Sequence, residues 1–187
     1  MRKQLEDTKK ELDSFYSLKN KDGVEEKEKA LATDYLNWVQ KKTRIIANEK
    51  SFVIPDHITI KRGDVFWIEF GYNIDEEFGG RHPGIILRRG GNTVFVVPLS
   101  TQEPNEQQKS NGNYVEIPRV YDFKNIKRWV NVLNATPISI QRIDFTSNKG
   151  NVKGFVLDKI NEAMDKTGLW RIKKNSGSMK KSKESVK

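Results

Sequence analysis

The sequence predicts an α+β fold: a small antiparallel β-barrel with a C-terminal helix, preceded by an N-terminal helical hairpin. The first 50 residues space their apolar side chains with a helical period, whereas the chain after Pro55 alternates side chains with a period of two, as strands do. Several short strands follow within fewer than 80 residues, without a helix long enough for a parallel crossover. Antiparallel pairing in a small barrel is therefore expected.

Residues 1–50 are predicted to form a helical extension of two helices. In the second, an apolar stripe recurs at three- and four-residue steps: Leu31, Tyr35, Trp38, Lys42 and Ile45. It predicts a helix from about Val24 to Asn48, and Asp22-Gly23-Val24-Glu25 has the capping-box spacing expected at its start. A weaker stripe predicts the earlier helix. The pair is expected to pack on itself, on the following domain or on a second copy of the chain.

The barrel domain is predicted to span residues 51–172. Its strands are expected at residues 64–70, 84–87, 93–99, 113–117 and 128–133. The glycines at 90 and 91 suit a tight hairpin, and residues 101–112 are expected to form a polar loop. Phe66, Trp67 and Phe70 are expected in the barrel core, and stacking on nucleic-acid bases is the alternative, open above all for Trp67.

The C-terminal part is predicted to be one helix followed by a disordered basic tail. An apolar stripe that stops at Thr167-Gly168 predicts the helix, and it contains Leu157, Ile160 and Met164. The net charge is +9, and more than half of it lies in residues 173–187, which hold six lysines and one glutamate. This tail has too little apolar surface to offset the entropy of ordering. It is expected to attract polyanions weakly or to be a solubilising segment.

Composition excludes several kinds of site. There is no cysteine, and the two histidines, His57 and His82, lie too far apart for a local metal motif, so neither a metal nor another cofactor is expected. Asp75-Glu76-Glu77 is an alternative Mg²⁺ site, although such a run is more often a solvated loop. The sequence has no apolar run of about 18 residues and no apolar signal segment, so a cytoplasmic location without a membrane partner is expected.

The stretch EEFGGRHPGIIL, residues 76–87, places two glycines and two potential cations directly before an apolar strand. Gly79 and Gly80 allow unusual backbone conformations and close approach of another chain, and Pro83 biases His82 toward an extended conformation. A cationic loop at the barrel rim is therefore expected. If residues 81–83 are extended, Arg81 and His82 point to opposite faces, and both reach one ligand only if the glycines bend the loop. The alternative is a glycine hairpin with incidental surface charges.

Two stretches together, KRGDVFWIEFGYNIDEEFGGRHPGIIL and TVFVVPLSTQ, resemble the core of the MazF/PemK/Kid family of toxin-antitoxin endoribonucleases. A weaker match continues through NYVEI, NVLNATPISIQRI and LDKINEAMDK, so that the resemblance covers about residues 60–168. It implies a small SH3-like barrel, usually a homodimer. It also implies cleavage of single-stranded RNA, such as mRNA, without a metal ion, and inhibition by a cognate antitoxin protein.

The resemblance also implies a catalytic pair: an arginine directly before the loop proline, and a threonine or serine after the Pro-Leu strand end. The second maps onto Ser100, with Thr101 beside it. Alignment on Pro83 places His82 at the arginine position and Arg81 one residue earlier. The expected catalytic set is Arg81, His82, Ser100 and Thr101. Residues expected to bind RNA or support the loop are Glu77, which accepts hydrogen bonds from the glycine-loop amides, Gly79, Gly80, Asn134 and Thr136.

These side chains suffice for attack by the RNA's own 2′-hydroxyl. His82 would transfer the proton, Arg81 would offset phosphorane charge, and Ser100 or Thr101 would donate a hydrogen bond. The products would be a 2′,3′-cyclic phosphate and a 5′-hydroxyl, and DNA would resist cleavage. Two alternatives remain: a catalytically degenerate barrel that binds RNA or a protein, suggested by the displaced arginine, and a toxin directed at a protein such as DNA gyrase.

Overall fold

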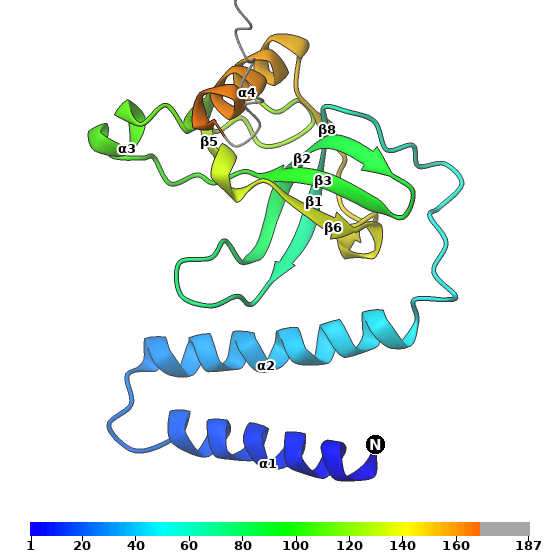
Figure 1. The fold of residues 1–187 in the computed structure, drawn as a ribbon, viewed down its shortest axis with the longest axis vertical. Helices are drawn as coiled ribbons and strands as arrows, with labels where there is room; N and C mark the ends of the chain where they lie inside the picture. Colours follow the sequence, from blue (N-terminus) through cyan, green and yellow to red (C-terminus); the bar gives the residue numbers. More distant parts are fainter. Residues whose placement is uncertain (169–187) are drawn as a thin grey trace, which may run out of the picture.

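The computed structural model describes residues 1–168. A helical hairpin lies on one side of a β-barrel, and a C-terminal helix covers the opposite side (Figure 1). The helices are α1 (Arg2–Lys19), α2 (Glu26–Ala47), α3 (Glu106–Ser110) and α4 (Gly154–Thr167). The predicted α+β class, with its antiparallel sheet, N-terminal hairpin and C-terminal helix, is confirmed. The predicted tail, residues 173–187, and the last four residues of the predicted barrel domain lie outside the described residues.

Antiparallel strands build the barrel. They are β1 (Asp64–Gly71), β2 (Gly80–Gly90), β3 (Thr93–Pro98), β4 (Tyr114–Ile117), β5 (Arg128–Asn131), β6 (Thr136–Ser139), β7 (Ile143–Asp144) and β8 (Gly150–Asn151). The main sheet has the order β6-β3-β2-β1-β7, and β4 pairs only with β5. The two outer strands, β6 and β7, are consecutive in sequence and are joined by one 3₁₀ turn, η2 (Ile140–Arg142). This short link brings the two sheet edges together.

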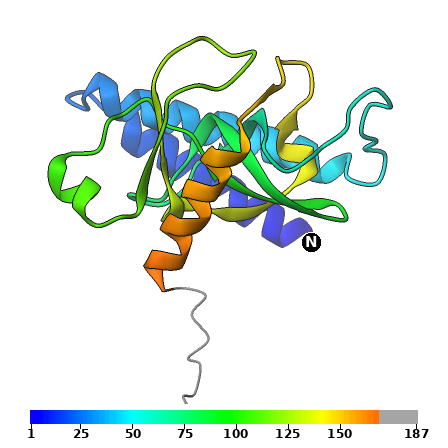
Figure 2. The same ribbon diagram turned by 90° about the horizontal axis from the view of Figure 1, so that it is seen from above.

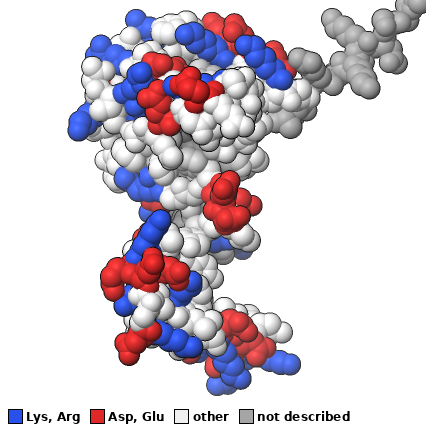
Figure 3. Space-filling model, turned by 90° about the vertical axis from the view of Figure 1, so that its left-hand side faces the viewer, with Lys and Arg blue, Asp and Glu red and all other residues white. Residues whose placement is uncertain are grey.

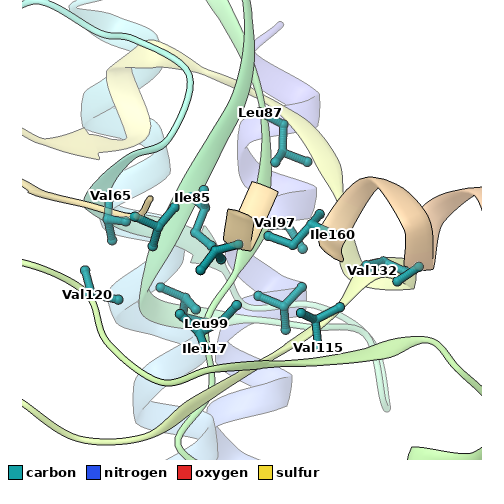
Figure 4. Close-up of a cluster of buried hydrophobic side chains, with 14 residues drawn as sticks. Val65, Ile85, Leu87, Val97, Leu99, Val115, Ile117, Val120, Val132 and Ile160 are labelled. Carbon is teal, nitrogen blue, oxygen red and sulfur yellow. The ribbon is translucent and has the colours of Figure 1, made fainter. Parts of the chain in front are cut away.

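Both faces of β1, β2 and β3 are buried, each in its own core cluster. Odd-numbered residues such as Val65, Ile85 and Val97 face a cluster that β4, β5 and α4 cover (Figures 2 and 4). Even-numbered residues such as Phe66 and Ile86 face a second cluster inside the curled sheet, together with apolar side chains from β6, η2 and β7. Burial on both faces explains why these strands read as nearly continuous apolar runs.

The hairpin reaches the barrel through one face of α2. Tyr35 contacts Tyr72 edge to face, with ring centroids 5.3 Å apart, and Lys41 forms an ion pair with Glu69. On its other side, Tyr35 meets Phe15 of α1 at 4.9 Å. The pair therefore packs both on itself and on the following domain, two of the three arrangements expected from sequence.

Three local predictions were wrong. The second helix begins at Glu26 without a side-chain cap, because the chain turns at Gly23, whose φ is 88°, instead of forming the expected capping box. The segment 101–112, expected to be a polar loop, contains α3. Asn105 and Gln108 cap the N-terminus of this helix with a reciprocal capping box. Residues 80–83 are the first residues of β2 and not a loop, because they pair with β1.

The α4 helix should contribute stability through Ile160, which is fully buried in the cluster between sheet and helix. Ile160→Ala is expected to lower the free energy of unfolding by about 2–5 kcal/mol, because it leaves a cavity in a packed core. Phe155→Ala, on the same helix at a position 51% exposed, is the matched control. Urea denaturation measures both, and equal effects of the two substitutions would contradict this packing.

Candidate functional site

The strand register separates the two candidate cations of the GGRHP segment. Arg81 pairs with Glu69 and His82 with Ile68, so the two side chains project to opposite faces of β2. Gly80, with φ of 80°, takes part in the register shift beside Gly71, but the glycines do not bend residues 81–83 out of the sheet. The condition under which both cations reach one ligand is therefore not met.

Arg81 forms a cross-link between strands. Its Nη2 donates to Asp144 Oδ2 at 2.7 Å and to Ser147 Oγ at 3.0 Å, and its Nε lies 3.5 Å from Glu69 Oε1. The guanidinium also stacks 4.6 Å from the centroid of the half-buried Trp67 ring. This side of β2 faces a hollow of about 960 Å³ between α2 and residues 71–81. Arg81 thus holds β2 to β1 and β7 on the side that faces the hairpin.

The electrostatics of Asp144 reflect the same cross-link. Burial raises the pKa of Asp144, but hydrogen bonds from Thr146, Ser147 and Arg81 outweigh it and hold the pKa well below its usual range. A carboxylate that stays ionised keeps its attraction for the guanidinium over the whole neutral range. The charge of Arg81 is therefore already balanced within the protein.

His82 lies on the other face of β2, where it packs against an aromatic side chain. Its ring centroid is 4.8 Å from that of Phe78. Burial lowers the pKa of His82 below its usual value, and a backbone hydrogen bond with Leu99 opposes part of this shift. A lowered pKa leaves the imidazole neutral at pH 7, and a neutral imidazole can accept a proton.

Ser100 follows the end of β3, which pairs with β2. Gly84 pairs with Pro98, and the hydrogen bond from Leu99 N to Pro83 O at 2.8 Å continues this register by one residue. Continuing it by one more residue would place Ser100 opposite His82, on the same face of the two strands. Ser100 is further fixed by two backbone hydrogen bonds with Trp129, at 2.9 and 2.8 Å. Its Oγ accepts from Gln102 N at 3.0 Å and still carries a proton to donate.

Two adjoining hollows open on this face, and we call them together the Phe78 groove because Phe78 and Asn134 line both. The smaller hollow, about 160 Å³, has Ser100, Gln102, Tyr114, Trp129 and Asn131 in its wall. The larger, about 620 Å³, includes Glu77, Thr136 and Arg142. Among the residues expected from sequence, the structure thus brings Glu77, Ser100, Asn134 and Thr136 to one groove, next to His82. Exposed Thr101 lines neither hollow.

The residues expected to support the loop lie at the connection between β1 and β2. Glu77 Oε2 accepts from Ile74 N at 3.2 Å, and so it closes its own turn and does not bind the glycine-loop amides. A Cβ at position 79 would lie 2.7 Å from Gly71 O, so only glycine lets the β1–β2 connection close this tightly. Gly79 and Gly80 therefore shape the connection.

Sequence reasoning missed Arg142, the last residue of η2. Its Nη1 donates to Phe70 O at 3.0 Å, and its guanidinium carbon lies 5.1 Å from the centroid of the Trp38 ring. Burial lowers the pKa of Arg142, yet arginine remains charged at neutral pH. The available signal was a single cation within the apolar segment ISIQRIDF.

The face of the molecule shown in Figure 3 carries charges of both signs. On the face shown in Figure 3, basic and acidic side chains are mixed over both barrel and helices. Within residues 1–168, Asp75, Glu76 and Glu77 do not form a group that could hold a metal ion, and neither do other carboxylate or histidine side chains. Over the same range, every helix is too short or too polar to span a membrane.

A sequence model of PemK-like, MazF-like toxins of type II toxin-antitoxin systems matches residues 61–167, more than half of the chain. The chain belongs to this family. The match contains the whole Phe78 groove of this PemK/MazF-like toxin, whereas both helices of the hairpin lie outside it. A search of curated proteins gave no match.

Solved structures of similar proteins include other toxins. One is an endoribonuclease in complex with its cognate antitoxin from a mycobacterial species, 20% identical, covering 61% of this chain and 100% of its own, with a TM-score of 0.44. Another is MazF from Deinococcus radiodurans, 14% identical, covering 59% of this chain and 96% of its own, with a TM-score of 0.47. A MazE-MazF complex from the same organism is also similar, at 14% identity and a TM-score of 0.43 over 60% of this chain and 98% of its own.

The environment of His82 predicts how folding stability depends on pH. Because burial lowers the pKa of His82, the unfolded chain binds a proton that the folded protein does not, so stability should decrease as the pH falls below about 6.5. His82→Gln should remove part of this acid-side loss, whereas His57→Gln, at an exposed position, should not. Urea denaturation across pH measures this effect. Identical pH dependence of the parent protein and His82→Gln would contradict it.

Proposed function

We propose that this toxin is an endoribonuclease that cleaves single-stranded RNA at the Phe78 groove without a metal ion. The observation that carries the proposal is the position of His82 beside the groove: a half-buried imidazole with a lowered pKa packs against Phe78, and Ser100 lines the same groove with a hydroxyl group. Such a pair supplies a base and a hydrogen-bond donor, the groups needed to activate a hydroxyl nucleophile beside a phosphate.

The reaction begins at the 2′-hydroxyl of the RNA. His82 takes its proton as the 2′-oxygen forms a bond to phosphorus, and Ser100 donates a hydrogen bond to a phosphate oxygen. Arg142, the cation of the groove, offsets the charge that develops on the phosphorane. The bond from phosphorus to the 5′-oxygen then breaks, that oxygen takes a proton from water, and His82 gives the proton it accepted to the resulting hydroxide. A 2′,3′-cyclic phosphate and a 5′-hydroxyl remain.

The lining of the groove favours unpaired RNA. Partly exposed Tyr114 offers an aromatic face, and Gln102, Asn131 and Asn134 offer amides that can both donate and accept hydrogen bonds. Sequence-tolerant stacking and amide contacts to base edges require bases that are not already stacked and paired in a duplex. Single-stranded mRNA is therefore the proposed substrate.

The proposed partners follow from the family. A toxin of a type II system is paired with a protein antitoxin, and two of the similar solved structures are complexes of that kind. We extend this to the present chain: a cognate antitoxin binds it and blocks the groove in the cytoplasm. A homodimer is proposed on the family resemblance.

A second candidate function is binding without cleavage. The observation that favours it concerns Arg81, which lies one residue before the position where the family resemblance implies a catalytic arginine. Glu69 and Asp144 already neutralise the charge of Arg81. In that case the groove would hold RNA or a protein segment, and no phosphodiester bond would be broken.

The two functions are distinguished by whether the RNA is cleaved. The parent protein is expected to cleave single-stranded RNA equally well with EDTA, leaving cyclic phosphate ends, and to leave the same oligonucleotide intact when 2′-deoxy sugars remove the nucleophile. Denaturing gel electrophoresis and mass spectrometry of the fragments measure both. Activity lost in EDTA and restored by Mg²⁺ would contradict the metal-free mechanism, and intact RNA would favour the binding function.

Substitutions distinguish the two faces of β2. His82→Ala is expected to reduce the single-turnover cleavage rate by about 10²–10⁴-fold, the range typical of a general base, and to remove most of its pH dependence. Ser100→Ala should cause a partial loss. Arg81→Gln should lower the rate less than about tenfold at temperatures where the variant is folded, because the charge of the Arg81 guanidinium is already neutralised within the protein. A loss with Arg81→Gln as large as that with His82→Ala would show that Arg81 reaches the phosphate.

A further inference from the structure

The indole ring of Trp38 on α2 lies directly against the backbone of β1. A Cβ added to Gly71, whose φ is 95°, would meet three atoms of this indole at 2.6–2.9 Å. Only glycine leaves room for so close an approach. The contact is therefore specific, and it fixes the ring at the point where β1 ends.

The orientation of α2 is set by contacts on the same face of the helix. Tyr35, Trp38 and Lys41 follow each other at three-residue steps, so they share one side of the helix. They meet Tyr72, Gly71 and Glu69, in that order. The helix thus runs along the end of β1, and Trp38 occupies the middle position.

The same indole also contacts Arg142, whose guanidinium carbon lies 5.1 Å from the ring centroid. The hydrogen bond to Phe70 O, at 3.0 Å, restrains the guanidinium from a second direction. An arginine side chain has many rotamers, and ordering it costs conformational entropy. Two restraints therefore hold the Arg142 guanidinium at the wall of the larger hollow of the Phe78 groove before any ligand binds.

We propose that Trp38 is a positioning residue for RNA binding: α2, which lies outside the family match, holds Arg142 in the Phe78 groove to receive an RNA phosphate. This inference rests on the proposed function, because Arg142 is assigned there as the cation of the groove. It gives the hairpin a part in the site, in addition to its packing on the barrel.

The salt dependence of RNA binding isolates this effect. Each phosphate contact with single-stranded nucleic acid adds about 0.7 to the slope of log K against log salt concentration. Arg142→Gln is therefore expected to reduce the slope by about 0.7 and to weaken binding about fivefold at 0.1 M salt. The probe is a short single-stranded RNA of mixed sequence with 2′-O-methyl sugars, which the 2′-hydroxyl mechanism cannot cleave, and fluorescence anisotropy measures its binding.

Variants of the hairpin test the positioning role. Trp38→Leu should reduce the slope as Arg142→Gln does, and it should have no further effect in the Arg142→Gln background. Trp38→Phe, which keeps an aromatic face, should retain most of the slope. Gly71→Ala should displace the indole without altering either partner and give the same result as Trp38→Leu. Tyr16→Ala, at an exposed aromatic side chain of α1, is the control and should leave the slope unchanged.

The outcomes separate this inference from the function on which it rests. A parent protein that binds no RNA overturns both. If the parent binds RNA and Arg142→Gln lowers the slope, but folded Trp38→Leu and Gly71→Ala keep the parent slope, the positioning role alone is overturned. An unchanged slope in Arg142→Gln overturns the role of both residues in RNA binding, while cleavage by the parent would still support the nuclease. Melting curves confirm that each variant is folded.

Discussion

The alternation of side chains along β2 is the constraint on which the arrangement of this molecule depends. Because β1, β2 and β3 are buried on both faces, a slip of their register by one residue would exchange the side chains of the two core clusters and disrupt the packing of both. The same register decides that His82 lies against Phe78, next to the groove, and that Arg81 lies on the face toward the hairpin. The chemistry of the groove and the attachment of the hairpin are therefore two consequences of one strand pairing.

The side of β2 that faces the hairpin shows how the second consequence is built. Glu69 lies between Lys41 of α2 and Arg81, and Arg81 in turn binds Asp144 of β7. Exposed ion pairs contribute little singly, but charges that share partners hold one another in place. In this network the hairpin, the first two strands and the strand at the barrel edge are joined across about a hundred residues of sequence.

Sequence patterns predicted the helices and strands whose formation depends on residues close together in the chain. The stripe of Leu31, Tyr35 and Trp38 located α2, and the alternation around Phe66 located β1. The GGRHP segment was mistaken for a loop because glycine and proline usually interrupt strands, whereas here pairing with β1 overrides that tendency. Arg142 could not be assigned, because its surroundings come from Trp38 and Phe70, which are distant in sequence. The capping box of α3 was missed, although Asn105 and Gln108 stand at the required spacing.

The contact between Trp38 and Arg142 also affects the order in which the molecule can assemble. An isolated helix of the length of α2 can begin to form from local interactions, and most of its contacts are with the end of β1, but Arg142 lies on η2, the turn that joins the two edges of the barrel. During synthesis the contact between Trp38 and Arg142 cannot form until the chain beyond Arg142 has been made. Contacts of such long sequence separation form late in folding. The Trp38–Arg142 contact therefore completes a docking that β1 can begin.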